Sequence, residues 1–356
     1  MVYLDANASE PLRPEARAAV LAALDLPGNP ASVHAAGRAA RRVMEDARAA
    51  IAVQFGARAG GVVFTSGGTE ANALGITALS RGRRVIIGAT EHDAVRACPH
   101  DAEILPVGND GVADLEALAR MLAGSPALVC LMLANNETGT LQPVAAAAAL
   151  CRQHGALLHV DAVQAAGRID TDLGLLGADS MALSSHKLGG PKGAGALLLA
   201  PGQDIVPLIA GGGQERGRRG GTPALPAIAG FAAAAEAARS DLAAMRDAAE
   251  FHAVGCGAVV LGGAHRLPNT SCVALPGVRA DTQVIALDLA GIAVSAGAAC
   301  SSGKVGRSHV LDAMGAGALA GEAVRVSLPW NATWDDVHAF QAAYGAMAAR
   351  LAKRAA

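Results

Sequence analysis

The chain has few aromatic residues, no excess of either charge and no long apolar run. Aromatic residues make up 3% of the 356 residues, and 29 basic side chains nearly balance 31 acidic ones, which gives a net charge of −2. This balance excludes the strongly basic surface that is typical of nucleic-acid-binding proteins. No apolar run reaches the ~18 residues that a membrane span requires, and residues 1–5 lack the basic start of a signal peptide. We therefore expect a cytoplasmic protein with neither a nucleic-acid partner nor a membrane partner.

The six cysteines form no CxxC pair and no spacing typical of a metal site. The sequence therefore predicts no disulfide framework and no bound metal. Cys130 and Cys272 lie inside apolar runs, and we expect them to be inert core thiols. Cys300 differs, because it lies among very small residues in 295–306, where nothing bulky can bury the sulfur. Near Lys304 such a thiol could ionise and react as a thiolate, or it could be an exposed bystander, and both interpretations stay open.

Short apolar runs alternate with helical patterns from about residue 37 to 250. This alternation is typical of an α/β fold with a mostly parallel sheet covered by helices on both faces. The chain is long enough for a second domain, and shorter apolar runs after residue 252 predict a smaller α+β unit. Residues 232–252 are expected to form one long connecting helix. The predicted strands are 62–65, 84–87, 128–133, 157–160, 180–183 and 194–199 in the first part, and 258–261, 270–274, 292–295 and 324–328 in the second.

Polar side chains follow several of the predicted strands. Ligands of parallel α/β sheets collect at the carboxyl ends of the strands. Just beyond such ends lie Ser66, His92, Asn136, Asp161 and His186. We therefore expect these residues to border one site.

Lys187 and Asp161 are the strongest candidates for chemistry. Lys187 ends the run Ser184-Ser185-His186-Lys187 after one strand, Asp161 ends the strand expected beside it, and the chain has only four lysines. A primary amine can form a Schiff base with the aldehyde of pyridoxal phosphate (PLP), and an aspartate can hold the pyridine nitrogen protonated. The pair favours a PLP site, although these residues alone leave a surface lysine with an unrelated aspartate equally open.

Three other segments have both a functional and a plain structural interpretation. Residues 65–72 follow a strand and begin a helix, so their glycines and free amides could hold a phosphate, or Thr69 could simply be the N-cap of the helix. His92 could stack on a cofactor ring and move protons, or cap a helix. Asn136, within 135–139, could contact cofactor and substrate, or belong to a turn.

Arginines in two places suggest anion binding. Residues 211–222 contain six glycines and three arginines, a combination that favours phosphate or carboxylate contacts, or a subunit interface. Arg325 lies inside an apolar strand, so we expect it to have an anionic partner such as a substrate carboxylate.

Taken together, these segments resemble the cysteine desulfurases, which are PLP enzymes of fold type I in the class V aminotransferase group. The resemblance covers nearly the whole chain in one collinear order, and residues 299–302 with 308–311 resemble the long-loop branch of the family. The matching motifs are 3–5, 28–34, 65–70, 90–92, 135–139, 159–164, 184–187, 211–222, 295–300 and 324–327.

The resemblance implies a role for each site residue. It implies a large PLP-binding domain of residues 14–250 and a small domain of residues 1–13 plus 251–356, which carries the reactive cysteine. The implied catalytic residues are Lys187, Cys300 and His92, and the implied substrate contacts are Arg325 and Asn136. The implied cofactor contacts are Lys187, Asp161 at the pyridine nitrogen, His92 on the ring, Gln164 at the phenolic oxygen, Asn136, and Gly68, Thr69, Ser184, His186 and a second subunit's Thr222 at the phosphate.

The implied activity converts L-cysteine to L-alanine in a homodimer, with the sulfur held as a persulfide on Cys300 for an acceptor protein, as in iron–sulfur cluster assembly. A selenocysteine lyase or an aminotransferase of the same group is an alternative, although an aminotransferase has no use for Cys300. A non-catalytic binding protein of this fold would need none of Lys187, Asp161 and Cys300. Two departures from the family pattern stand out: residues 6–10 lack the usual pair of threonines, and only 31 residues follow Arg325, which disfavours docking of an acceptor through a C-terminal tail.

Overall fold

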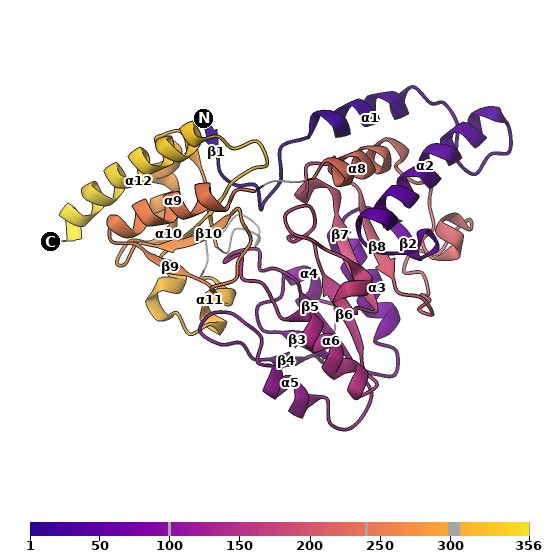
Figure 1. Cartoon of the computed structure of the whole chain (residues 1–356), viewed down its shortest axis with the longest axis horizontal. Helices are drawn as coiled ribbons and strands as arrows, with labels where there is room; N and C mark the ends of the chain where they lie inside the picture. Colours follow the sequence, from indigo (N-terminus) through magenta and orange to yellow (C-terminus); the bar gives the residue numbers. More distant parts are fainter. Residues whose placement is uncertain (99–100, 239–240, 298–306, 356) are drawn as a thin grey trace.

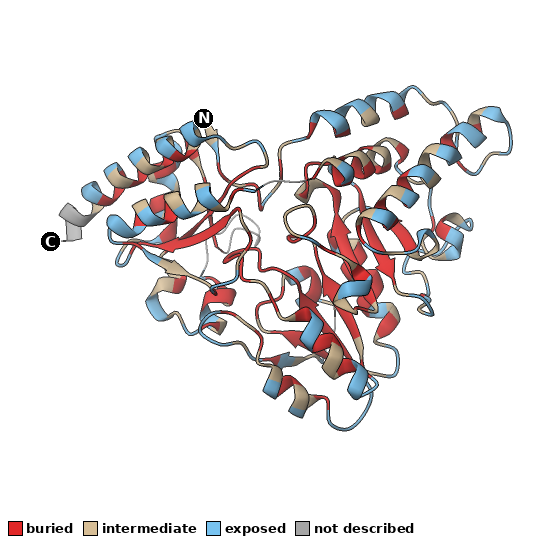
Figure 2. Cartoon of the chain, in the orientation of Figure 1, coloured by how far each residue is buried: buried red, intermediate tan, exposed pale blue. Residues whose placement is uncertain are grey.

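The computed structural model describes residues 1–98, 101–238, 241–297 and 307–355, with side chains up to residue 351. Within this part of the chain, a larger sheet and a smaller sheet form two lobes (Figure 1). Figure 2 shows that the strands of both sheets are buried while the outer helix faces are exposed. Each sheet is therefore covered by helices and has a core of its own.

The larger sheet is mostly parallel, as the alternating pattern predicts. The pairs β3–β4, β3–β5, β5–β6 and β6–β7 are parallel, whereas β8 runs antiparallel to β7 and to β2. The three-residue edge strand β4 is the one that the sequence pattern does not predict. In sheet order the strands are β2 (Val62–Thr65), β8 (Gly195–Leu199), β7 (Ser180–Ser184), β6 (Leu157–Asp161), β5 (Ala127–Met132), β3 (Arg84–Gly88) and β4 (Glu103–Leu105).

Alternate side chains of the larger sheet enter two separate cores. In β5, Val129 and Leu131 pack on one face with α6, whereas Leu128 and Cys130 pack on the other with α3. Period-two alternation with both faces covered explains why these strands are almost continuously apolar. On the α3 face lie α3 (Gly68–Leu79) and α4 (Asp93–Arg96), and the opposite core includes residues of α1 (Pro14–Leu24), α2 (Ala35–Gln54), α5 (Leu115–Met121), α6 (Val144–Gln153), α7 (Leu173–Leu176) and α8 (Leu225–Ala237).

The smaller sheet is antiparallel and forms the predicted α+β unit. Its apolar core contains residues of α9, α10 and α12, and a second cluster with α11 covers its other face. The N-terminal strand β1 (Val2–Tyr3) pairs in parallel with β11 (Ile292–Ala293) beside it. The strands in order are β12 (Ser295–Ala296), β13 (Ala323–Ser327), β10 (Thr270–Ala274) and β9 (Val259–Leu261), and the helices are α9 (Ala243–Gly255), α10 (Ala280–Leu289), α11 (His309–Ala313) and α12 (Trp334–Ala355).

The prediction of one long helix over 232–252 is wrong, because α8 ends at Ala237 and α9 begins at Ala243. Ala238 is extended, with φ −74° and ψ 96°. The N-cap residue of α9 is Leu242, which gives no side-chain cap, and the Asp241 carboxylate before it accepts a hydrogen bond from the amide of Ala243 at 3.3 Å. The predicted division at residue 250 falls inside α9, which packs on the smaller sheet, and the domain boundaries 14–250 and 1–13 plus 251–356 stay a prediction.

Other expectations concern burial and the surface. Cys130 and Cys272 are fully buried, as predicted, and burial raises the pKa of both thiols.

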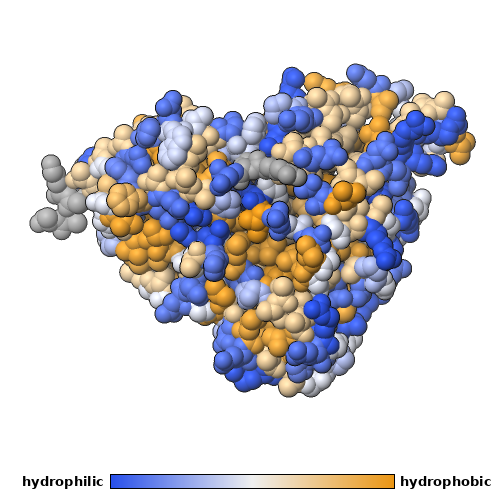
Figure 3. Space-filling view, viewed as in Figure 1, coloured by the Kyte–Doolittle hydropathy of each residue, from blue (hydrophilic) through white to orange (hydrophobic). Residues whose placement is uncertain are grey.

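In the described part of the chain, no helix is both long and apolar enough to cross a membrane. Figure 3 shows one face of the molecule, on which hydrophilic residues surround smaller hydrophobic groups.

Candidate active site

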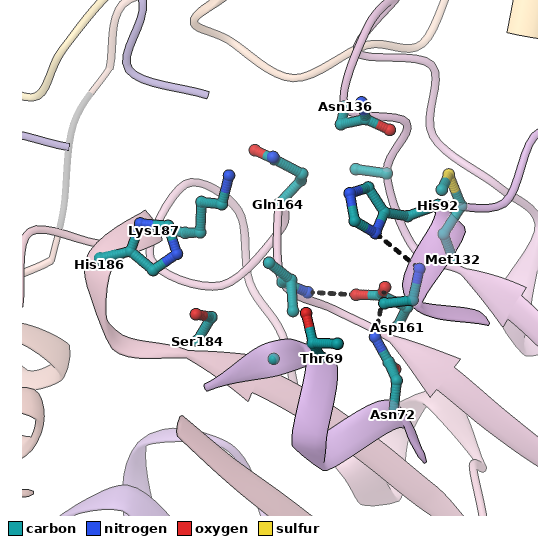
Figure 4. Close-up of a pocket in the computed structure, with 14 residues that line it drawn as sticks. Thr69, Asn72, His92, Met132, Asn136, Asp161, Gln164, Ser184, His186 and Lys187 are labelled. Atoms are coloured by element: carbon teal, nitrogen blue, oxygen red, sulfur yellow. Dashed lines mark hydrogen bonds between the residues drawn. The ribbon is translucent and has the colours of Figure 1, made fainter. Parts of the chain in front are cut away.

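A cavity of about 170 Å³ lies at the carboxyl ends of the parallel strands (Figure 4). Nine of the predicted site residues line it: Gly68, Thr69, His92, Asn136, Asp161, Gln164, Ser184, His186 and Lys187. Strand register explains their convergence. Asp161 is paired with Met132 in β5 and with Ala182 in β7, so consecutive strands end at nearly the same level. The polar residues that follow these ends therefore face one volume.

Lys187 ends the short 3₁₀ turn Ser185–Lys187 directly after β7. Its ammonium group donates to the backbone oxygens of Asn7, at 2.5 Å, and Ala8, at 3.1 Å. The N-terminal segment thus lies against the amine, and its carbonyl groups hold the amine in place. Sequence reasoning missed this contact, because backbone oxygens carry no side-chain signal.

Asp161 is oriented by a chain of buried hydrogen bonds. Its Oδ2 accepts from Asn72 Nδ2 at 2.8 Å, and its Oδ1 accepts from the amide of Val163 at 2.9 Å. The other end of the Asn72 amide lies 2.9 Å from His159 Nε2, and His159 Nδ1 lies 2.7 Å from Ser180 Oγ. Sequence reasoning missed Asn72, although it lies one helical turn after Thr69 on α3 and this spacing places both on one face.

The direction of every proton in this chain follows from chemistry. Burial lowers the pKa of His159 to about 4, so the ring is neutral at pH 7. Asn72 uses its amide nitrogen on Asp161, which leaves its oxygen facing His159. His159 must therefore donate from Nε2 and accept at Nδ1 from the Ser180 hydroxyl. These hydrogen bonds allow one orientation of each side chain, and they fix the orientation of the Asp161 carboxylate.

His92 caps a helix and also lines the cavity, while its stacking on a cofactor ring stays a prediction. It is the N-cap residue of α4, where Nδ1 accepts from the amide of Ala94 at 3.0 Å, and it also lines the cavity. Because Nδ1 accepts a hydrogen bond, the neutral ring carries its proton on Nε2. The cap therefore fixes both the ring plane and its tautomer.

The start of α3 forms one end of the cavity, with a geometry that suits an anion. The N-cap of α3 is Gly67, so the interpretation of Thr69 as the N-cap is wrong. Thr69 lies instead in the first turn, and the free amides of this turn favour a bound anion. A side chain on Gly68 would place its Cβ only 2.7 Å from Val163 Cγ2, so the backbone here needs glycine.

His186 lies near this end of the cavity and is neutral at pH 7. Burial, with the neighbouring charges of Lys187, Lys192 and Arg168 as smaller causes, lowers its pKa to about 4. Its Nδ1 lies 3.3 Å from Ser9 Oγ, in the N-terminal segment. The ring is therefore a neutral hydrogen-bonding group next to an ammonium ion.

The two neighbouring asparagines divide the roles that the sequence leaves open. Asn135 serves the turn, because its Oδ1 accepts from the amides of Glu137 and Thr138, both at 2.9 Å. The Asn136 side chain lines the cavity. Asn135 thus holds the turn while the adjacent Asn136 faces the cavity, and contact of Asn136 with cofactor or substrate stays a prediction.

Arg325 does not line the cavity, although it lies beside it. The guanidinium is buried and donates to Asp5 Oδ1 at 2.6 Å and to the backbone oxygen of Asn136 at 3.1 Å. The anionic partner that the sequence predicts is therefore present within the chain, as Asp5. A substrate carboxylate that binds Arg325 must share it with Asp5 or displace Asp5.

The glycine–arginine segment 211–222 forms ion pairs within the chain. Arg218 pairs with Asp204 at 2.9 Å and Arg219 pairs with Glu70 at 2.8 Å. Thr222 is exposed and does not line the cavity of its own chain. Its contact with the phosphate of a second subunit stays a prediction.

Cys300 lies outside the described residues, and so does most of the segment that suggests the long-loop branch. Two described residues near residues 298–306, Gly297 before them and Ser308 after them, both meet Glu137. Ser308 donates to Glu137 Oε2 at 2.6 Å, and a Cβ on Gly297 would lie 2.5 Å from the same oxygen. Because Glu137 directly follows the cavity residue Asn136, Gly297 and Ser308 both lie near the cavity.

The chain is similar to known proteins in sequence and in structure. The profile of the aminotransferase class-V family matches residues 2–340. The chain is 45% identical to a cysteine desulfurase of Cereibacter sphaeroides over 88% of this chain and 86% of the relative. The solved structure of a NifS-like protein covers 99% of both chains with a TM-score of 0.91 and 33% identity. The structure of SspA in complex with cysteine covers 94% of this chain and 100% of that chain, with a TM-score of 0.83 and 29% identity.

The fold is that of PLP enzymes of fold type I. The chain belongs to the aminotransferase class-V family and, within it, to the PLP-dependent cysteine desulfurases. The cavity fits this cofactor, because an amine, a fixed carboxylate and a helix N-terminus without room for a side chain surround one volume. Five further residues that sequence reasoning missed also line it: Asn72, Ala94, Met132, Ala134 and Val163.

Proposed function

We propose that this protein converts L-cysteine to L-alanine and carries the released sulfur as a persulfide on Cys300. The observation that carries this proposal is the cavity at the end of the sheet, which brings together Lys187, Asp161 and the start of α3. The family of the chain supplies the substrate class. Bound cysteine in the SspA structure supports the same class of substrate.

Lys187 and Asp161 have complementary roles in this proposal. Bound PLP supplies an electron sink for the negative charge that develops at the substrate Cα. Asp161, held by Asn72, keeps a proton on the pyridine nitrogen, which strengthens that sink. The Lys187 amine holds the cofactor and removes the Cα proton, and His92 is placed to assist with proton transfer from Nε2.

The sulfur step needs only the substrate and Cys300. The Cys300 thiolate attacks the substrate sulfur, a new S–S bond forms and the Cβ–S bond of the substrate breaks. The electron pair of the broken bond stays with the three-carbon fragment, which takes up one proton at Cβ, regains at Cα the proton that Lys187 removed, and leaves as alanine. Arg325 and Asn136 hold the substrate carboxylate. Cysteine and the enzyme thiol thus become alanine and an enzyme persulfide, with no other oxidant or reductant.

The proposal includes a cytoplasmic homodimer that passes sulfur to an acceptor protein, for example in iron–sulfur cluster assembly. The exposed Thr222 supports the dimer, because it does not line the cavity of its own chain and is accessible to a second subunit. Val33, which is 84% exposed, also supports it. The nearby residues 29–31 border a cavity together with the glycine–arginine segment, so apolar surface lies close to that segment.

Replacing Lys187 tests the cofactor anchor. Lys187→Ala is expected to abolish borohydride-stable attachment of PLP and to reduce alanine formation by at least ~10²-fold, because the variant lacks both the anchor and the base. Lys192→Ala is the matched control, since Lys192 is an exposed lysine five residues along the chain. Mass analysis after borohydride treatment measures the attachment. PLP still attached to the Lys187 variant would show that another lysine is the anchor.

A further inference from the structure

The N-terminal segment contributes a buried ion pair next to the cavity. Glu10 and Arg168 lie 158 residues apart in the sequence, yet Arg168 Nη2 lies 3.3 Å from Glu10 Oε1, and each side chain is only 5% exposed. Glu10 belongs to the segment in which this chain departs from the family pattern. The proposed reaction assigns no role to either residue.

Arg168 directly contacts the side chain of Gln164. Its Nη1 donates to Gln164 Oε1 at 2.5 Å and to the Gln164 backbone oxygen at 3.0 Å. A guanidinium group carries donors and no acceptor, so the amide oxygen of Gln164 must face Arg168. The amide nitrogen is consequently turned the other way, where it donates to the backbone oxygen of Asn7 at 3.0 Å. That oxygen also accepts from Lys187, so the donor end of Gln164 lies at the amine.

Glu10 is itself fixed from two sides. Its Oε2 accepts from the amide of Trp330 at 3.2 Å, and its own amide donates to the backbone oxygen of His186 at 2.9 Å. Burial raises the pKa of the Glu10 carboxyl and lowers that of the Arg168 guanidinium, while each charge partly offsets the effect on the other. Buried ion pairs add little net stability because both ions lose their hydration. The contacts of Glu10 and Arg168 are therefore better suited to orienting neighbouring side chains than to stabilising the fold.

We propose that Arg168, neutralised by Glu10, is a positioning residue that keeps the amide NH₂ of Gln164 turned into the cavity as a donor to the phenolic oxygen of PLP. This inference rests on the proposed role of Gln164 at that oxygen. An N–H group stabilises the oxygen in its anionic form, whereas a reversed amide would place two oxygens against each other. Loss of Arg168 therefore favours the protonated state of the cofactor and raises the pH at which its visible absorbance changes.

The test is a pH titration of the visible absorbance of the reconstituted holoenzyme. In the double variant Arg168→Met/Glu10→Gln, which removes both charges together, the midpoint is expected to rise by about 0.5–1 pH unit, the effect of one hydrogen bond. Arg168→Lys keeps the charge but must divide one ammonium group between Glu10 and Gln164, so a smaller rise is expected. Gln164→Ala removes the amide donor altogether, so its rise in the midpoint is the largest that loss of this hydrogen bond can cause.

The matched control is Arg266→Met/Glu250→Gln. This pair is also an Arg–Glu pair of low exposure, with side chains 12% and 11% exposed and Nη1–Oε1 at 2.6 Å, and neither residue lines the cavity. Its midpoint should equal that of the wild type. A change of the same size in this control would mean that general destabilisation causes the shift, and it would overturn the proposal.

The outcomes separate this inference from the proposed function. If Gln164→Ala shifts the midpoint and the Arg168 variants do not, the positioning role is overturned while the proposed function stands. If the double variant fails to fold, Arg168→Lys decides, and a wild-type midpoint in that variant contradicts the proposal. If Gln164→Ala itself leaves the midpoint unchanged, both the role of Gln164 and its positioning by Arg168 are wrong. Failure of the proposed function would instead appear as PLP attached without Lys187.

Discussion

At the scale of single residues, Asp161 is supported by neutral groups. Asn72, His159 and Ser180 form a chain of hydrogen bonds with only one consistent set of proton positions. A protonated ring would donate from Nδ1 as well, so the Ser180 hydroxyl would have to accept and the direction of that hydrogen bond would reverse. Burial, which lowers the pKa of His159 to about 4, keeps it neutral over the physiological range.

The depressed pKa of His159 predicts a pH dependence of stability. His159 takes up a proton in the unfolded chain near its ordinary pKa of about 6.5, but in the folded protein only near pH 4. Its contribution is therefore complete above pH 6.5 and is lost as the pH falls toward 4, by up to roughly 3 kcal/mol. Urea unfolding of the wild type and of His159→Gln, at fixed PLP concentration, measures it. Glutamine cannot titrate but can still donate to Asn72.

The difference in free energy of unfolding between the two proteins should shrink on going from pH 7 to pH 4.5. Other groups that titrate in this range, such as Glu10, are common to both proteins and cancel in the difference. A constant difference over this range would show that the His159 proton is not coupled to folding.

At the scale of elements, the start of α3 has no spare room. A Cβ on Gly68 would meet Val163 Cγ2 at 2.7 Å and Ser184 Cβ at 3.2 Å, which both lie at the cavity wall. We expect Gly68→Ala to weaken PLP binding by about tenfold or more, because an overpacked methyl group costs roughly 1–3 kcal/mol. Gly255→Ala is the control, since a Cβ there meets nothing within 4 Å. Equal PLP affinity of both variants in a fluorescence titration would contradict the claim that the start of α3 has no room for a side chain at residue 68.

Much of the site is predictable because strand ends are predictable. Apolar runs fix the ends of β6 and β7, so Asp161 and Lys187 stand out as polar residues in the right place. The Glu10–Arg168 pair and the carbonyl groups of Asn7 and Ala8 are not predictable in this way. They join segments far apart in the sequence, and a backbone oxygen has the same chemistry at every residue. The break between α8 and α9 is not predictable in this way either, because the alanine-rich sequence has a high helix propensity and α9 starts without a capping side chain.

At the scale of the whole molecule, a subunit-mixing experiment tests the dimer. Lys187→Ala protein lacks the anchor, and Thr222→Ala protein lacks the proposed contact with its neighbour. If Thr222 reaches across the interface, each mixed dimer contains one site with both Lys187 and Thr222 intact. Mixing the two variants should then restore PLP binding of wild-type affinity to part of the sites, and light scattering should show a dimer. No restoration, or an active monomer, would contradict the proposed assembly.

The most direct test of the central claim follows the sulfur to Cys300. Wild-type protein incubated with L-cysteine is expected to form alanine and to gain the mass of one sulfur atom on residue 300. Cys300→Ser should still bind PLP covalently, but its alanine and sulfide production should fall by orders of magnitude, because a hydroxyl group with a pKa far above neutrality cannot replace a thiolate. Near-normal sulfide release by the serine variant, or added sulfur on another cysteine, would contradict the account of this protein as a desulfurase that acts through Cys300.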